Sequence, residues 1–415
     1  MTAPDFDTML RDTLATLPDG PVGIAVSGGG DSMALMVLAA DWAKATGRRV
    51  FAATVDHGLR PEAAEEARFV AGVAARLGLP HEVLCWTGWD GRGNLQSQAR
   101  QARYGLLAGW AGRHGLRGVL LAHTSDDQAE TLLLRMARGA GVDGLSAMAV
   151  RFAQRDTVFL RPLLRARRDD LRGFLRDRGQ DWIEDPSNSD TRFDRVKARQ
   201  SLPTLAEFGL NADRMAQVAD NMAEARAALN WAAQRFVSDN VDRVAGDLIV
   251  KRDSFLDLPA ELARRVVVAA LAWLSGADYP PRRAEVGHFL SAIRDGKGAT
   301  LQGCRMMPRK GGLHLFREYD AIRDMVAVPG AAWDGRWVLT GPDDAGCRVA
   351  ALGEEGLAQC PDWRAGGRPA AAVMADPAVW RDNDLIAAPV SGLHNGWQAT
   401  LGPGRDDFAI ALYSH

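Results

Sequence analysis

Short apolar runs alternate with longer amphipathic stretches over the first two hundred residues. Short runs bounded by glycine, proline and polar residues are typical of buried parallel strands. The longer stretches are rich in alanine, leucine and arginine, which favour helix. The predicted strands are 22–26, 50–55, 81–86 and 118–122, and the predicted helices are 6–17, 33–40, 62–77, 94–110 and 132–136. This alternation predicts an α/β fold built on a doubly wound, mainly parallel sheet.

The second half of the chain follows a different pattern. A long alanine- and arginine-rich stretch at 211–241 has few turn signals and predicts one helix that connects two domains. Apolar alternation at 300–316, around a Gly-Gly turn, predicts a hairpin, and short strands follow from Trp333. Two further helices are predicted, at 258–274 and 282–294. The expected domains are 1–205, 206–325 and 326–415, of which the second is helical and the third is a small α+β domain.

A glycine-rich turn joins the first predicted strand to the helix behind it. The turn consists of Ser27, Gly28, Gly29, Gly30, Asp31 and Ser32. Residues without a Cβ let a ligand approach the backbone, and N–H groups at a helix start attract phosphate. Asp31 would repel phosphate, so it makes sense mainly as a ligand of Mg²⁺ that in turn binds phosphate oxygens. The turn lacks a Walker A lysine and the spacing of a dinucleotide fold. The alternative is an ordinary tight turn.

Polar side chains also follow the second and fourth predicted strands. They are Asp56 and His57 after the second, and His123, Asp126, Asp127 and Glu130 after the fourth. Because ligands bind at the carboxyl ends of parallel strands, we expect these side chains to meet the glycine turn at one edge of the sheet. Each also has an ordinary structural explanation. Asp126 could equally cap the helix that follows it, and a single histidine at a strand end is usually just hydrogen-bonded.

The glycine turn resembles the pyrophosphate-binding loop of the N-type ATP pyrophosphatases, which cleave ATP between its α- and β-phosphates. A series of further segments is similar, in order, to the motifs of one family on this fold, the tRNA(Ile)-lysidine synthetases. The matching segments are 55–60, 94–100, 121–131, 138–141, 144–148, 161–164 and 182–188, followed by Phe193, Arg195 and Arg199. Two positions depart from the family pattern, because Thr124 replaces a common second histidine and Gln96 a common glutamate. The resemblance covers the first expected domain and implies the adenine nucleotide alpha hydrolase-like fold.

The resemblance implies a reaction. A lysidine synthetase activates C2 of the cytidine at the wobble position of an isoleucine tRNA with a CAU anticodon. The α-phosphate of ATP is attacked, pyrophosphate leaves, and free L-lysine then displaces AMP from the adenylated base to give lysidine. The implied cofactors are ATP and Mg²⁺. The oligomeric state stays open, with a homodimer as one option.

The resemblance also implies roles for particular residues. Asp31 is the expected magnesium ligand. Asp127 is the first candidate for the base that deprotonates lysine, with His57 and His123 as rivals. The expected catalytic residues are Asp31, Asp127 and Arg100. Besides the glycine turn, the residues expected to bind ATP are Asp56, His57 and Arg103, and Arg100 or Arg103 would pair with the α-phosphate. The residues expected to contact lysine are Asp56, His123, Asp126 and Glu130. The residues expected to contact tRNA are Arg161, Arg192, Arg195 and Arg199.

Charge and composition narrow these expectations. The formal net charge is -2, so any tRNA-binding surface must be local, and the arginines of 165–178 could instead form a solvated helix face with paired charges. The four cysteines form no CxxC pair, which favours reduced cytoplasmic thiols over zinc or iron–sulfur sites. No apolar run approaches the roughly 18 residues of a membrane span, and the N-terminus does not read as a signal peptide.

Two alternative functions remain open at this stage. One is a tRNA thiolation enzyme on the same fold, although sulfur transfer generally needs cysteines and only Cys85 lies in the first expected domain. The other is an inactive RNA-binding homologue, against which the intact glycine turn and Asp127 argue.

Overall fold

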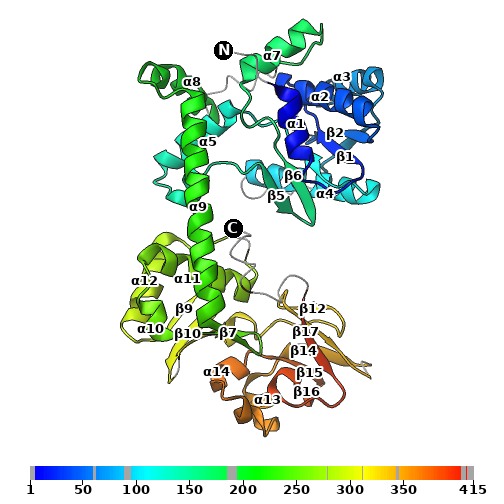
Figure 1. The fold of residues 1–415 in the computed structure, drawn as a ribbon. Helices are drawn as coiled ribbons and strands as arrows, with labels where there is room; N and C mark the ends of the chain where they lie inside the picture. Colours follow the sequence, from blue (N-terminus) through cyan, green and yellow to red (C-terminus); the bar gives the residue numbers. More distant parts are fainter. Residues whose placement is uncertain are drawn as a thin grey trace. The chain divides into compact units, whose positions relative to one another are not determined.

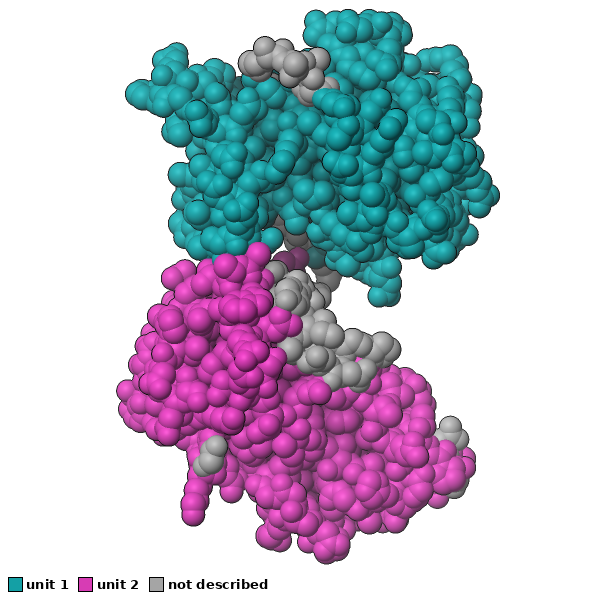
Figure 2. Space-filling view, in the orientation of Figure 1, with its two compact units in different colours: residues 1–226 teal, residues 227–415 magenta. Residues whose placement is uncertain are grey.

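The computed structural model describes residues 5–58, 62–87, 95–184, 194–277, 279–310, 312–342, 345–402 and Phe408. The chain forms two compact units, unit 1 (residues 1–226) and unit 2 (residues 227–415), which are coloured separately in Figure 2. Each unit has its own hydrophobic core. The expected division into three domains, with boundaries near residues 205 and 325, stays a prediction.

Unit 1 is built on a six-stranded sheet with the order β3-β2-β1-β4-β6-β5 (Figure 1). The strands are β1 (Val22–Ala25), β2 (Val50–Asp56), β3 (His81–Cys85), β4 (Val119–Leu120), β5 (Arg151–Gln154) and β6 (Thr157–Leu160). All neighbouring strands are parallel except β5 and β6. The predicted mainly parallel sheet is therefore confirmed. The β5–β6 hairpin is an addition that the sequence pattern did not predict.

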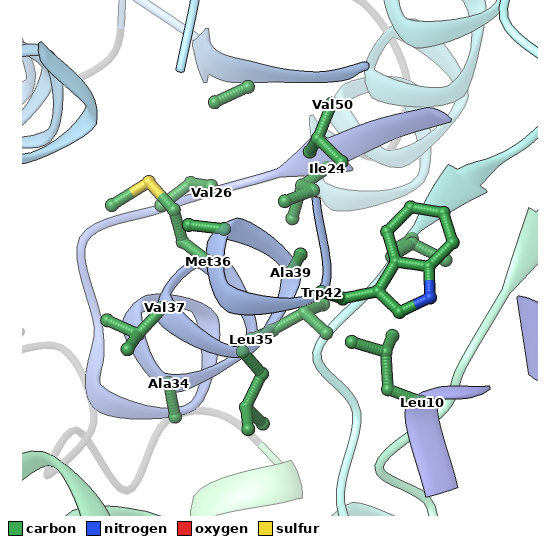
Figure 3. Packing of buried hydrophobic residues seen from close by; sticks show 14 of the residues in the cluster. Leu10, Ile24, Val26, Ala34, Leu35, Met36, Val37, Ala39, Trp42 and Val50 are labelled. Carbon is green, nitrogen blue, oxygen red and sulfur yellow. The ribbon is translucent and has the colours of Figure 1, made fainter. Parts of the chain in front are cut away.

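Helices precede, connect and follow these strands. They are α1 (Phe6–Leu14), α2 (Gly30–Thr46), α3 (Ala63–Leu77), α4 (Leu95–His114), α5 (Ser125–Ala137), α6 (Val142–Leu145), α7 (Arg168–Asp177), α8 (Asp194–Glu207) and α9 (Ala212–Asn240), of which α9 begins in unit 1 and ends in unit 2. α2 is buried around most of its circumference, and its side chains form one cluster with Ile24 of β1 and Leu10 of α1 (Figure 3). Packing on several sides fixes the start of α2 and, with it, the glycine turn.

One helix begins earlier than the sequence pattern predicted. The expected helix at 132–136 is the end of α5, which starts at Ser125. The first turn consists of polar residues that carry no apolar repeat, so periodicity does not reveal it. Thr124 caps this turn through its side chain. Asp126 is therefore not the N-cap of α5, and that structural explanation is wrong.

Unit 2 contains one five-stranded sheet, β7-β8-β11-β10-β9, and two three-stranded sheets, β12-β13-β17 and β14-β15-β16. The strands are β7 (Val241–Val244), β8 (Asp247–Val250), β9 (Ala299–Leu301), β10 (Cys304–Arg309), β11 (Gly312–Arg317), β12 (Ala332–Trp333), β13 (Trp337–Thr340), β14 (Cys347–Ala351), β15 (Pro377–Arg381), β16 (Asp384–Ala387) and β17 (Gln398–Leu401). The helices are α10 (Arg252–Leu256), α11 (Ala260–Ser275), α12 (Arg283–Arg294), α13 (Gly353–Gln359) and α14 (Ala370–Val373).

The main elements predicted for the second half are present. The helix at 211–241 is α9, the helices at 258–274 and 282–294 are α11 and α12, and the hairpin at 300–316 is β10 with β11. Among the helices of the described residues, none combines the length and the apolar character that crossing a membrane requires.

A buried network of charged groups ties two sheets of unit 2 together. Arg368 is only 6% exposed, and its guanidinium donates to both Asp376 oxygens, at 2.6 and 2.7 Å, and to Asp247 Oδ2 at 2.8 Å. Ser391 Oγ donates to Asp376 Oδ2 at 2.7 Å. Asp247 begins β8 and Asp376 precedes β15. Burial opposes the charge on Arg368, but the two carboxylates outweigh it and raise the pKa of the guanidinium.

Candidate active site

The glycine turn follows β1 and includes the first three residues of α2, Gly30, Asp31 and Ser32. Gly29 is the N-cap residue of α2, and Ser32 Oγ donates to its carbonyl oxygen at 2.9 Å. The Ser27 N–H donates to Ser32 Oγ at 3.2 Å, which closes the turn. Gly28 has a φ of +88°, and a Cβ there would lie 2.8 Å from Ile183 Cδ1. A side chain at this position would therefore be strained and crowded, so the turn requires glycine here.

Asp31 lies in the first turn of α2 with its two carboxylate oxygens in different environments. Arg168 Nε donates to Oδ2 at 3.1 Å. Oδ1 is buried and has no hydrogen-bond partner among the described residues. Burial is the main reason that the pKa of Asp31 lies above its usual range, although Arg168 opposes the shift. A buried carboxylate oxygen without a donor is a ready ligand for a cation.

Asp127 is held in place by the capping of α5. The backbone N–H and the hydroxyl of Thr124 both donate to Asp127 Oδ2, at 2.9 and 3.0 Å. The departure from histidine at position 124 therefore has a structural role, because threonine caps the helix and orients Asp127. Burial disfavours the ionised carboxylate, but the positive charges of Arg168 and Arg195 outweigh it and lower the pKa of Asp127.

Arg168 lies at the centre of an acidic cluster formed by Asp31, Asp126, Asp127 and Glu130. Sequence reasoning did not identify Arg168 as a site residue. Its guanidinium lies 3.1 Å from Asp31, 3.4 Å from Asp127 and 3.6 Å from Glu130. Its backbone N–H also donates to Asp126 Oδ2 at 2.8 Å. The usable signal was the apolar run at 158–160, which forms β6 beside β4. The segment after β6 therefore returns to the same edge of the sheet.

Glu130 binds the two arginines of α8 that the family pattern singled out. Its side chain is fully buried, and Arg199 Nε donates to Oε1 at 2.7 Å. Arg195 Nε lies 3.4 Å from Oε2. Arg195 and Arg199, which were expected to contact tRNA, therefore lie at the acidic cluster and balance part of its negative charge.

The two histidines near the cluster are held in the neutral form. Burial lowers the pKa of His57, and it lowers the pKa of His123 to about 3, helped by Arg161 and opposed by Asp127. The Nδ1 atoms of both rings are buried, and neither has a hydrogen-bond partner within the part of the chain that the structure describes. A neutral imidazole does not attract an ammonium group, whereas the ionised Asp127 does, so Asp127 remains the candidate that holds the ε-amine of lysine.

The pKa of His123 predicts a pH dependence of stability. Between the ordinary pKa of 6.5 and the folded value of about 3, the unfolded chain takes up a proton that the folded chain does not. Stability therefore falls as the pH falls below 6.5, and this group alone should cost about 2 kcal/mol between pH 7 and pH 5. His123→Gln should remove that part of the pH dependence in urea unfolding curves. His288→Gln, at an exposed position of α12, should leave it as in the wild type. An unchanged slope in His123→Gln would refute the assignment.

The remaining expected site residues lie in different environments. Arg100 is exposed, with its guanidinium 5.3 Å from the centre of the Tyr104 ring, and Arg103 lies one turn further along α4. Asp56 Oδ1 accepts the Gly58 N–H at 2.8 Å. Arg161 is 5% exposed, donates to the Ala149 carbonyl and stacks on Phe152. These contacts make Arg161 part of the packing. Arg192 and the side chain of Gln96 lie outside the described residues.

The arginines around α7 are mostly paired with acidic residues. The pairs are Arg165 with Asp220, Arg167 with Asp213, Arg172 with Glu184 and Arg178 with Asp41. These pairs match the alternative expectation for this stretch, a solvated helix face with balanced charges.

The sequence is similar to those of known proteins. The PP-loop domain family matches residues 3–205 of the chain. A curated tRNA(Ile)-lysidine synthase from Ruegeria pomeroyi is 50% identical over 413 residues, covering 100% of this chain and 99% of the relative. Proteins of the same name from Wolbachia pipientis wMel and Bradyrhizobium diazoefficiens are 33% and 44% identical, covering 89% and 68% of this chain and 88% and 81% of the relatives. The chain therefore belongs to the tRNA(Ile)-lysidine synthase family.

Proposed function

We propose that this chain ligates L-lysine to C2 of the wobble cytidine of an isoleucine tRNA with a CAU anticodon, through an adenylated cytidine. AMP and pyrophosphate are released. One observation carries the proposal: a glycine turn suited to phosphates lies beside a cluster of carboxylates suited to ammonium groups. The names of the relatives agree with this reading. Thiolation finds less support, because Cys85 is the one cysteine of unit 1.

The glycine turn would bind the phosphates of ATP. The first N–H groups of α2 have no partner within the helix, and the helix dipole favours negative charge at this end. Ser27 and Ser32 lie with their hydroxyls 3.3 Å apart and can both reorient to donate to a phosphate oxygen. Arg100 or Arg103 would then stabilise the charge that grows on the α-phosphate as cytidine O2 attacks it.

The residues present also fit a magnesium ion. Asp31 would hold it through Oδ1, the buried oxygen that accepts no hydrogen bond from the described residues. Within the described part of the chain, no group of three metal-ligating side chains forms a complete cage. This agrees with the usual binding of Mg²⁺ by one or two carboxylates together with substrate phosphates. When bound, the ion supplies positive charge that stabilises the departing pyrophosphate.

The acidic cluster would bind and activate lysine. Its amino groups are protonated at neutral pH, and the ε-amine must lose a proton before it can attack. Asp127 remains ionised and is oriented by Thr124, so it can hold the ε-ammonium and take its proton as the bond to C2 forms. Asp56, Asp126, His123 and Glu130 would contact the remaining polar groups of the amino acid.

The tRNA would approach over α8. Arg195 and Arg199 project from this helix toward Glu130. An open groove between α5 and α8 lies on the same helix and is lined by Leu133, Lys197, Gln200, Ser201, Thr204 and Leu205. Its lysine, amide and hydroxyl groups are suited to phosphate and ribose contacts. Arg161 and Arg192 complete the proposed set, although the burial of Arg161 gives it an indirect part.

The decisive experiment measures products with each substrate omitted in turn. The full-length chain is incubated with ATP, Mg²⁺, L-lysine and a tRNA transcript with a CAU anticodon. Lysine-bearing cytidine should be detected by mass spectrometry after nuclease digestion, and only with all components present. Exchange of labelled pyrophosphate into ATP should require tRNA but not lysine, because adenylation comes first. AMP release that ignores tRNA, or a modified base without lysine, would refute the proposal.

A further inference from the structure

One side chain neutralises the acidic cluster from its centre. Each nitrogen of the Arg168 guanidinium faces a different carboxylate: Nε faces Asp31, Nη2 faces Asp127 and Nη1 faces Glu130. The Arg168 side chain is 16% exposed, and the side chains of the three acids are 20%, 14% and 0% exposed in the same order. These are largely desolvated contacts, where a charge acts more strongly than on the surface.

The charge of this guanidinium is permanent. Arginine does not lose its proton at any pH at which proteins work, so Arg168 cannot be switched off by titration. The two other arginines of the cluster, Arg195 and Arg199, are directed at Glu130. Arg168 is therefore the positive partner that contacts both Asp31 and Asp127.

The oxygens that Arg168 engages belong to groups that also serve the ligands. Asp31 is the proposed magnesium ligand, and Asp127 is the proposed receptor for the lysine ammonium. A fixed positive charge next to Asp31 Oδ2 repels a divalent cation that approaches Oδ1 of the same carboxylate. Nucleotide phosphates bring negative charge into the site and offset that repulsion.

We propose that Arg168 is a positioning residue that orients Asp31 and Asp127 while the magnesium ion and the lysine ammonium are absent. Its positive charge also prevents a divalent ion from binding at Asp31 until nucleotide phosphates arrive with that ion. The inference rests on the proposed function only in taking Asp31 as the metal ligand. Metal and nucleotide thus enter together, and the site does not fill with metal alone.

The test measures metal binding without catalysis. Mn²⁺, a substitute for Mg²⁺ that electron paramagnetic resonance detects, is titrated into the full-length protein with no nucleotide, lysine or tRNA. Wild type should bind it weakly, and a non-hydrolysable ATP analogue should tighten binding. Arg168→Gln should bind Mn²⁺ alone about tenfold or more tightly than wild type, because one unit of nearby positive charge is lost.

Two further variants separate charge from structure. Arg165→Gln removes the same charge from a surface pair with Asp220 and should leave the Mn²⁺ affinity unchanged. Arg168→Lys keeps a positive charge without the three-way geometry, so its affinity should stay near that of wild type even if Arg168→Gln fails to fold. A merely structural role predicts equal or weaker metal binding in Arg168→Gln, and that result would overturn the inference. So would a large change in Arg168→Lys, or tight Mn²⁺ binding by wild type alone. Absence of lysidine would leave these binding results untouched and would count against the proposed function only.

Discussion

Asp31→Asn is expected to lower the rate of AMP formation at least about a thousandfold at saturating ATP, lysine and tRNA. The change keeps the size and position of the side chain but removes its negative charge. Asp31 is the carboxylate proposed to hold the magnesium ion, so the charge on the leaving pyrophosphate would lose most of its stabilisation. Losing an electrostatic contact made in the transition state typically lowers the reaction rate by roughly two to three orders of magnitude, and losing a metal ligand lowers it further.

The loss should be specific to chemistry. Burial already disfavours the charge on Asp31, so asparagine should cost the folded state little. Arg168 keeps Asp127 and Glu130 as partners. Asp41→Asn is the matched control, because Asp41 lies on the same helix, carries the same charge and pairs with Arg178 away from the turn. The control should retain wild-type activity. Activity of Asp31→Asn within tenfold of wild type would remove Asp31 from the adenylation step.

Arg368→Met is expected to destabilise unit 2 by about 3–5 kcal/mol, because it leaves two buried carboxylates without their shared partner. Burial raises the pKa of Asp247 to about 7 even beside Arg368, and it also raises the pKa of Asp376. Without the guanidinium, both acids would bind protons more readily in the folded state than in the unfolded chain. Stability gained by proton uptake is present at low pH and lost as the pH rises, so the deficit should be larger at pH 8 than at pH 5.

Urea unfolding of the intact chain at both pH values measures this effect. Arg364→Met serves as the control. Arg364 lies four positions before Arg368, is exposed and stacks on the neighbouring Trp363. It should change stability by less than about 0.5 kcal/mol. A deficit below about 1 kcal/mol for Arg368→Met, or one that shrinks toward high pH, would mean that the network contributes little.

Local signals account for the parts of the fold that the sequence predicted. The strand, glycine turn and helix at 22–46 are readable because burial makes β1 and the middle of α2 apolar and because the turn requires glycine at Gly28. The β5–β6 hairpin escaped prediction because its strands are short. They meet at Arg155 and Asp156, two non-glycine residues with positive φ. No Asn-Gly or Gly-Gly signal marks such a turn.

The site also contains residues that the sequence predicted and residues that it did not. The acids after β2 and β4 could be predicted because parallel strands end at one edge of the sheet. Arg168 could not, because its contact with Asp31 joins residues separated by 137 positions, and nothing local distinguishes it from its arginine neighbours. The role of Thr124 was hidden for a related reason, since the sequence shows that a histidine is missing but not that a helix begins there.

The order of the charged residues along the chain has a consequence for biosynthesis. The ribosome releases Asp31, Asp127 and Glu130 before it releases Arg168, Arg195 and Arg199. A nascent chain that has formed β1 to β4 and α5 would carry these acids before the three arginines that pair with them have been made. The contacts of this cluster can therefore be completed only after α8 has been translated, and a ribosome stalled before that point would hold an intermediate whose buried acids lack their arginine partners, a natural target for chaperones.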